Sequence, residues 1–314
     1  MKAQLRISVA AALLLALCQS VTAQIEPSGT YLYDSRDGED LFMDVYEPAR
    51  GSVSEGKPAI LFMFGGGFKN GSRADASYLP WFKLMSDNGF RVFSIDYRLG
   101  LKGVTKVGIS NSSVIYDAIQ LAVEDLFRAT AFIAENADSF GVDPSRIVVS
   151  GSSAGAISVL EADWECANAA PLTSLLPEGF RYAGVISFAG AVFSKEGAVR
   201  YQREPAPTMF LHGTSDRIVN YKNTAFLNMR FSGSSILVKE FEKQGYNYRI
   251  YRFDGNGHEI ADADSMVASF DEQMSFIATN VMEGRRRIVD ALVSDPAVPV
   301  SASAKDGVNS IYAE

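Results

Sequence analysis

Near its middle the chain reads Arg146-Ile147-Val148-Val149-Ser150-Gly151-Ser152-Ser153-Ala154-Gly155, a short apolar run that leads into a G-x-S-x-G motif. The apolar run predicts a buried strand, and the residues from Ala156 onward follow a helical pattern. Ser153 stands at the centre of the motif, whereas Ser150 and Ser152 lie off its centre. The motif alone is a weak signal, because a chain rich in Gly and Ser contains it by chance often enough. Its context decides what it means.

Three further elements supply that context. Gly65-Gly66-Gly67 follows one apolar run, Asp216 follows another, and His258 comes after the last predicted strand. The resulting order is a Gly-rich loop, then Ser, then Asp, then His, each after a strand. This order predicts an α/β-hydrolase fold in which Ser153 is the nucleophile.

The rest of the chain alternates between short apolar runs and helical patterns. This alternation predicts a mostly parallel central sheet with helices on both faces. The first two strands are expected to pair through a turn at Asp37-Gly38. Only residues 189–206 separate two of the later strands, which leaves room for little or no cap domain. The expected strands are 30–33, 41–46, 59–64, 91–96, 146–150, 182–188, 207–211 and 248–253, and the expected helices are 115–133, 156 onward, 234–244 and 266–281.

The two ends of the chain are expected to lie outside the catalytic domain, which spans residues 24–285. Residues 1–23 have a basic start, an apolar stretch from Ile7 to Leu17 and small residues up to Ala23, the pattern of a signal peptide. We therefore expect export to the periplasm or beyond, with Gln24 first in the mature protein. A lipoprotein anchored through Cys18 is the weaker alternative, because bulky Leu17 stands where a small residue is expected. Residues 286–314, which contain prolines and serines, predict a loosely attached extension.

Composition excludes several classes of function. The net charge of −8 becomes −10 once residues 1–23 are removed, so nucleic acid and anionic membrane surfaces are poor partners. Cys166 is then the last cysteine, which rules out an intramolecular disulfide. Two histidines and one cysteine are too few for a typical zinc site, and we expect no metal and no cofactor. No later stretch predicts a transmembrane helix.

A serine hydroxyl needs a neighbouring base, and the base needs a carboxylate that orients it. His258 lies in a loop after the last predicted strand and is the expected base, whereas His212, directly before Gly213, is expected to be structural. Asp216 follows a strand at its carboxyl end and is the expected acid. Asp254 and Glu259 are the alternatives, but both share a loop with the histidine.

The tetrahedral intermediate of acyl transfer carries a negative oxygen that backbone N–H groups can stabilise. We expect Gly66, Gly67 and Ala154 to supply these groups, because a Gly-rich loop lets the backbone approach a ligand closely. Candidate aromatic contacts to the substrate are Phe64, Phe68 and Trp164. Ordinary core packing is the alternative for each of the three.

Several of these segments resemble a known group of enzymes. The loop Phe64-Gly65-Gly66-Gly67-Phe68 resembles the oxyanion segment of carboxylesterases and of hormone-sensitive-lipase-like esterases. The stretches 96–99, 141–155, 212–219 and 257–258 resemble their strand end, nucleophile elbow, acid segment and histidine loop. The likeness covers roughly residues 40–280. It implies an α/β-hydrolase with the triad Ser153, Asp216 and His258.

The chain also departs from that group at two positions. Phe64 stands where the lipase-like members have a histidine, and Ser152 stands where both groups usually have Asp or Glu. The chain further lacks the N-terminal cap helices of the lipase-like members. Its short layout resembles small secreted bacterial esterases that act on acetylated or feruloylated plant polysaccharides.

The function expected from these features is hydrolysis of carboxylic esters through an acyl-enzyme. Short-chain or aromatic acyl esters, including esters of carbohydrates, are the expected substrates. An amidase or peptidase with the same triad is one alternative, although the chain has no residues for the large extra domain of prolyl oligopeptidase relatives. A binding protein on a hydrolase fold is the other alternative. The presence of every expected triad residue argues against it.

Overall fold

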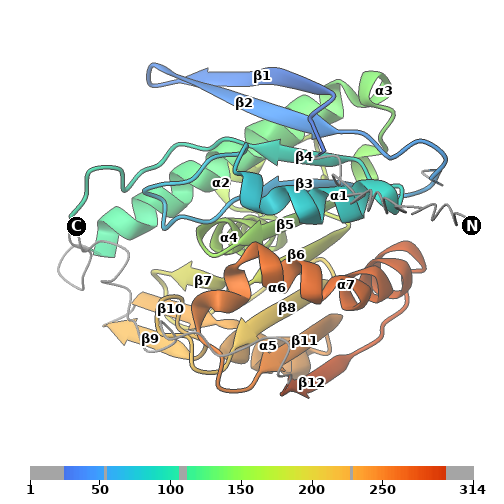
Figure 1. Cartoon of the computed structure of the whole chain (residues 1–314). Helices are drawn as coiled ribbons and strands as arrows, with labels where there is room; N and C mark the ends of the chain where they lie inside the picture. The colour runs from blue at the N-terminus through green and yellow to red at the C-terminus, as the bar shows by residue number, and fades with distance from the viewer. Residues whose placement is uncertain (1–24, 53–54, 106–111, 227–228, 295–314) are drawn as a thin grey trace, which may run out of the picture.

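A computed structural model describes residues 25–52, 55–105, 112–226 and 229–294. The expected signal peptide and Cys18 lie outside these residues. A nine-stranded sheet runs through the molecule in the order β1-β2-β4-β3-β5-β6-β8-β11-β12 (Figure 1). The neighbouring strands from β4 onward in this order are parallel to one another. Strand β2 is antiparallel to both of its neighbours, β1 and β4. The bounds of these strands are Gly29–Arg36 (β1), Glu39–Tyr46 (β2), Ala59–Met63 (β3), Val92–Ile95 (β4), Ile147–Ser152 (β5), Gly184–Phe188 (β6), Thr208–Gly213 (β8), Tyr248–Phe253 (β11) and Val289–Val293 (β12).

Helices cover both faces of this sheet, which confirms the expected α/β-hydrolase architecture. In Figure 1, α1, α6 and α7 lie in front of the sheet, and α2 and α4 lie behind it. The strands β3, β4, β5, β6 and β8 are buried along their whole length, which is why they read as continuous apolar runs. The α-helices are Leu79–Asp87 (α1), Ser112–Glu135 (α2), Ala137–Phe140 (α3), Ala154–Asn168 (α4), Ser234–Gln244 (α5), Ala263–Ala268 (α6) and Phe270–Phe276 (α7).

Local sequence explains several of these element boundaries. Asp37 and Gly38 both have positive φ, 53° and 84°, and they close the β1–β2 hairpin as expected. The expected helix over residues 266–281 is instead divided into α6, α7 and a π-helix, Ile277–Met282. Short 3₁₀ helices occupy Ala76–Tyr78 (η1), Pro144–Arg146 (η3), Pro171–Leu175 (η4) and His258–Ala261 (η5).

A second, small sheet was not expected from the sequence. Its strands β7 (Ala191–Ser194), β10 (Met229–Gly233) and β9 (Asn223–Phe226) pair antiparallel in that order. These strands come from the connections that follow β6 and β8, so the small sheet lies beyond the carboxyl ends of the central strands. No cap of helices is built there by the described residues. Beyond the carboxyl ends of the central strands, the described residues form this small sheet, loops and short helices such as η5.

The segment after residue 285 differs from the expected loose extension. Val289–Val293 forms β12, which pairs in parallel with β11 at the edge of the central sheet. The backbone edge of β11 accounts for this regular structure, because it offers a row of hydrogen-bonding groups to the returning chain. The loose-extension prediction is therefore wrong for residues 289–293. Residues 295–314 lie outside the described part of the chain.

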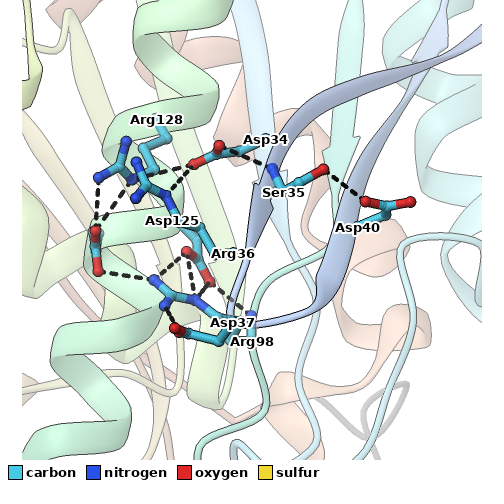
Figure 2. A network of polar contacts seen from close by, with 9 residues as sticks. Asp34, Ser35, Arg36, Asp37, Asp40, Arg98, Asp125 and Arg128 are labelled. Atoms are coloured by element: carbon cyan, nitrogen blue, oxygen red, sulfur yellow. Dashed lines mark hydrogen bonds and ion pairs between the residues drawn. The ribbon is translucent and has the colours of Figure 1, made fainter.

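A buried arginine ties the first hairpin to α2 (Figure 2). Arg98 is 7% exposed and donates two hydrogen bonds to the fully buried Asp125 carboxylate, from Nε at 3.0 Å and from Nη2 at 2.7 Å. Its guanidinium also donates to Glu124 at 2.8 Å and to Asp37 at 2.6 Å. Because Asp37 is a turn residue and the two other carboxylates lie on α2, this one side chain joins both elements to the end of β4.

We predict that Arg98→Met lowers the free energy of unfolding by about 3–5 kcal/mol, because it leaves the Asp125 carboxylate buried without a counter-charge. Urea denaturation measures the loss. Lys83→Met is the control, since it removes an exposed ion pair with Asp87 and is expected to cost at most about 1 kcal/mol. Equal losses in the two variants would show that the Arg98 network contributes little.

Helix α4 buries three carboxyl groups. Burial raises the pKa of Glu161 well above its usual value, that of Asp163 to about 6 and that of Glu165 to about 7. Glu165 Oε1 accepts a hydrogen bond from Gln120 Nε2 at 2.8 Å, which opposes the effect of burial only in part. Glu165 therefore takes up its proton in the folded state at a pH where the unfolded chain has lost it.

This difference makes stability fall as pH rises. Between pH 4.5 and about 7 the folded state holds the Glu165 proton more tightly than the unfolded chain. The free energy of unfolding should therefore drop across this window, by roughly 3 kcal/mol from this group at full effect. We predict that Glu165→Gln reduces the drop, as measured by urea denaturation at pH 5 and pH 8. Glu178→Gln alters an exposed carboxyl and should retain the parent's pH dependence. The same drop in Glu165→Gln would assign it to other groups.

Candidate active site

Ser153 lies on a sharp turn between β5 and α4. Its backbone has φ 51° and ψ −113°, a conformation that L-residues avoid and that costs about 1–3 kcal/mol. The turn needs both glycines of the motif. A Cβ at Gly151 would lie 2.3 Å from the carbonyl carbon of Gly155, and a Cβ at Gly155 would lie 2.1 Å from Met63 O. The close packing of β3, β5 and α4 therefore holds Ser153 at the carboxyl end of the central strands.

His258 approaches Ser153 from the loop that follows β11. Its Nε2 lies 2.7 Å from Ser153 Oγ, although the two residues are 105 positions apart in the sequence. His258 opens the 3₁₀ helix η5, and its side chain is partly exposed. Ser153 itself is 7% exposed. The structure thus brings the expected nucleophile and the expected base into hydrogen-bonding contact.

The carboxylate of Asp216 completes this arrangement. Its Oδ2 lies 2.8 Å from His258 Nδ1, and its Oδ1 accepts from the backbone N–H groups of Ile218 at 2.9 Å and Val219 at 3.1 Å. Burial alone would raise the pKa of Asp216, but hydrogen bonds from His212 and His258 hold it well below its usual value. The ionised carboxylate can only accept, so His258 carries its proton on Nδ1. Its Nε2 is then free to accept the proton of Ser153.

The two alternative acids do not occupy this position. Asp254 is exposed at the end of β11. Glu259 Oε1 accepts hydrogen bonds from its own loop, from Asn256 Nδ2 at 3.0 Å and from the Gly257 N–H at 2.9 Å. Of the three candidates, Asp216 is the carboxylate for which the structure shows a hydrogen bond to His258.

His212 has a larger part in this site than the sequence analysis gave it. It is fully buried, and its Nε2 lies 2.9 Å from Val219 O and 3.2 Å from Asp216 Oδ2. Both partners can only accept, so Nε2 carries a proton and donates it. Nδ1 lies 2.7 Å from Ser234 Oγ on α5. The second histidine of the chain therefore supports the Asp216 carboxylate at Oδ2, the same oxygen that His258 contacts. The spacing of four residues between His212 and Asp216 is the signal that could have indicated it.

The Gly-rich loop packs directly against Ser153. A Cβ at Gly65 would lie 3.2 Å from Ser153 Cβ, so a side chain there would require Ser153 to shift by a few tenths of an ångström. Gly66 and Gly67 follow with φ of 121° and 64°. Ala154 is the first residue of α4, where backbone N–H groups have no partner within the helix. The three expected oxyanion donors thus belong to segments that meet at Ser153.

Two of the aromatic residues proposed as substrate contacts are buried in the core, and the third lies on α4. Phe64 is 2% exposed and stacks on Tyr97, with 4.4 Å between ring centroids, and Phe68 is also part of the core. Trp164 lies ten positions beyond Ala154 on α4, about 15 Å along the helix axis. Its Nε1 donates to Arg200 O at 2.8 Å. The burial of Phe64 and Phe68 and the position of Trp164 along α4 favour the alternative of ordinary packing for these rings.

The described residues contain neither a candidate metal site nor a candidate membrane span. No group of three or more His, Cys, Asp or Glu side chains among them could hold a metal ion. Within the same residues, no helix has the length and apolar character required to cross a bilayer.

The described fold is that of the α/β-hydrolases. The structure of an esterase from the planctomycete Thermogutta terrifontis, with propionate bound, is similar to this fold with a TM-score of 0.60. The similarity covers 82% of this chain and 96% of that one at 21% sequence identity.

The sequence comparisons are more specific for the first half of the chain. Residues 16–161 match the carboxylesterase family, and this part of the chain is carboxylesterase-like. Gut esterase 1 of Caenorhabditis briggsae is 33% identical over 128 residues, which is 40% of this chain and 22% of that protein. Carboxylesterase 5A of Ovis aries is 33% identical over 119 residues, 38% of this chain and 29% of that protein. The matches thus span less than a third of the length of these relatives.

The geometry at Asp216 leads to a prediction about the reactivity of Ser153. We expect Asp216→Asn to slow covalent labelling of Ser153 by a fluorophosphonate probe by about 10⁴-fold, because an amide no longer holds His258 in the tautomer that accepts the serine proton. Mass spectrometry of the labelled peptide measures the rate. Asp254→Asn is the matched control in the exposed loop and should leave the rate unchanged. If instead Asp254→Asn slowed labelling and Asp216→Asn did not, the acid would be misassigned.

Proposed function

We propose that this protein is a serine carboxylester hydrolase that works through an acyl-enzyme. The observation that carries the proposal is the chain of hydrogen bonds from Ser153 Oγ through His258 to Asp216, at 2.7 Å and 2.8 Å. A serine hydroxyl held against an oriented imidazole is the arrangement that nucleophilic acyl transfer requires. The carboxylesterase-like sequence of residues 16–161 supports the same chemistry.

In the proposed reaction, Ser153 Oγ attacks the ester carbonyl carbon while His258 Nε2 takes its proton. Asp216 stabilises the imidazolium that forms and does not itself take the proton. The carbonyl oxygen becomes an oxyanion, and we assign its stabilisation to the backbone N–H groups of Gly66, Gly67 and Ala154. His258 then donates the proton to the leaving alkoxide, and the acyl group stays on Ser153.

Hydrolysis of the acyl-enzyme repeats these steps with water. His258 removes a proton from a water molecule, which attacks the acyl carbon, and the same proton returns to Ser153 Oγ as the acid leaves. The sequence of steps needs no metal and no cofactor. Both half-reactions pass through an oxyanion in the same place, so one set of donors serves both.

The proposed substrates are esters of short-chain or aromatic acids, with carbohydrates as candidate alcohols. The small β7-β10-β9 sheet replaces a cap domain at the mouth of the site, which supports a large or polar alcohol. Propionate, a short acid, is the ligand named for the similar Thermogutta terrifontis esterase. We further propose that the enzyme acts after export, on the basis of the signal-like pattern in residues 1–23.

We predict that the full chain hydrolyses p-nitrophenyl acetate and butyrate faster than the octanoate, and that Ser153→Ala lowers kcat by at least about 10⁴-fold. Release of p-nitrophenol measures both. Ser150→Ala is the matched control, because Ser150 is a fully buried serine on β5, the strand that leads to Ser153, and should be dispensable.

Three other outcomes would contradict part or all of the proposed function. Activity that survives in Ser153→Ala would place the nucleophile elsewhere. Faster cleavage of an aminoacyl p-nitroanilide than of any ester would identify an amidase. A parent protein without activity on either substrate would contradict the proposed reaction.

A further inference from the structure

Three segments of the proposed site come from distant parts of the chain. They are the oxyanion loop of residues 65–67, the nucleophile elbow of residues 151–155 and the histidine segment η5, His258–Ala261. Acyl transfer requires their reacting groups to hold one relative position, since a misplacement of about 1 Å can cost a hundredfold in rate. Contacts that join the three segments to one another should therefore affect the rate of acyl transfer.

The first such contact reaches the oxyanion loop. Tyr78 ends the 3₁₀ helix η1, and its side chain is buried beneath the loop. The backbone N–H of Gly65 donates a hydrogen bond of 3.1 Å to the Tyr78 hydroxyl oxygen. Gly65 directly precedes Gly66, the first of the expected donors, so the phenol fixes the backbone where the oxyanion loop begins.

The second contact joins the elbow to the histidine segment. Ser152, the residue before the nucleophile, is 2% exposed and donates from Oγ to the carbonyl oxygen of Ala261 at 2.6 Å. Ala261 closes the short helix that His258 opens. Ser152 thus links the backbone next to Ser153 with the backbone that carries the base. Its position is the one at which the resembling families usually have Asp or Glu.

The two contacts lie next to each other at Gly65. The Gly65 N–H is bonded to Tyr78, and a Cβ at Gly65 would lie only 3.0 Å from Ser152 Oγ. Ser152 has a single proton, which it donates to Ala261 O. Burial raises the pKa of Tyr78 above its usual value, so the phenol keeps its proton.

Tyr78 therefore holds the Gly65 N–H, and Ser152 lies against Gly65 while it holds the Ala261 carbonyl. We propose that Tyr78 and Ser152 form a positioning pair that sets the oxyanion loop, the nucleophile elbow and the His258 segment in register with one another. This inference rests on the proposed function of the site. Neither residue touches the reacting atoms, and each acts through the backbone that it holds.

Positioning and simple packing have different effects on kcat, KM and stability. A packing residue contributes to stability and leaves kcat of the folded enzyme unchanged. A positioning residue lowers kcat with little change in KM, because the substrate still binds while the transition state loses its donors. Two residues that hold the same backbone segment also show non-additive losses, and Tyr78 and Ser152 both contact Gly65.

The test compares Tyr78→Phe, Ser152→Ala and the double variant in the full chain. We expect each single variant to lower kcat for p-nitrophenyl acetate by about 10- to 100-fold with little change in KM. The kcat of the double variant should be little lower than that of the less active single variant. Tyr182→Phe is the matched control, because it removes a buried phenol hydroxyl that bonds to Thr130 near the opposite end of the central strands. It should lower the unfolding temperature and retain the parent's kcat.

Two outcomes would overturn the inference while the proposed function stands. Variants of Tyr78 and Ser152 that behave like Tyr182→Phe, with lower stability and the parent's kcat, would identify them as packing residues. Losses that multiply in the double variant would show that the two contacts act independently and do not form a positioning pair.

Labelling of Ser153 by a fluorophosphonate separates the inference from the proposed function. If the parent hydrolysed no ester but its Ser153 were labelled, the proposed function would fail, and the labelling rates of the same variants would decide the inference by the same criteria. If the parent showed neither hydrolysis nor labelling, both would be overturned.

Discussion

The close approach of three backbone segments around the G-x-S-x-G turn is the constraint on which the rest of the site depends. Gly155 meets the carbonyl of Met63 at the end of β3, and Gly151 meets the first turn of α4, so neither position has space for a Cβ. This contact forces Ser153 into a positive φ and brings the Gly-rich loop after β3 against its side chain. The backbone strain at Ser153 is sustained because buried strands surround it on both sides.

A second constraint is electrostatic. The Asp216 carboxylate is buried, yet hydrogen bonds from two histidines and from two backbone N–H groups keep it ionised. A buried charge of this kind is tolerable only when its acceptor positions are satisfied. His212 and the turn at residues 218–219 therefore set the conditions under which His258 can present an unprotonated Nε2 to Ser153. In the proposed arrangement, Tyr78 and Ser152 hold backbone segments of the site in place, as His212 holds the Asp216 carboxylate.

Much of the fold could be predicted because its signals are local. The Asp37-Gly38 turn and the apolar runs of β3 and β5 each follow from a few consecutive residues. The small sheet could not be predicted in this way. Its strands are four or five residues long, too short for a clear period, and β7 pairs with β10 across a gap that includes β8 and β9. The edge strand β12 was missed for a related reason, because its alternating pattern is brief and is followed by a stretch rich in proline and serine.

For the site, the sequence by itself determined which residue types were available and in which order they follow the strands. With only two histidines and one G-x-S-x-G motif, it pointed to Ser153, His258 and Asp216. The tertiary structure decided which side chains meet. It separated Asp216 from Asp254 and Glu259, gave His212 its contact with the carboxylate, and placed Phe64 and Phe68 in the core. Tyr78 carries no motif at all, and only packing brings its hydroxyl to Gly65 and Ser152. Hydrogen bonds between residues far apart in the sequence depend on distance in space, and no spacing along the chain records that distance.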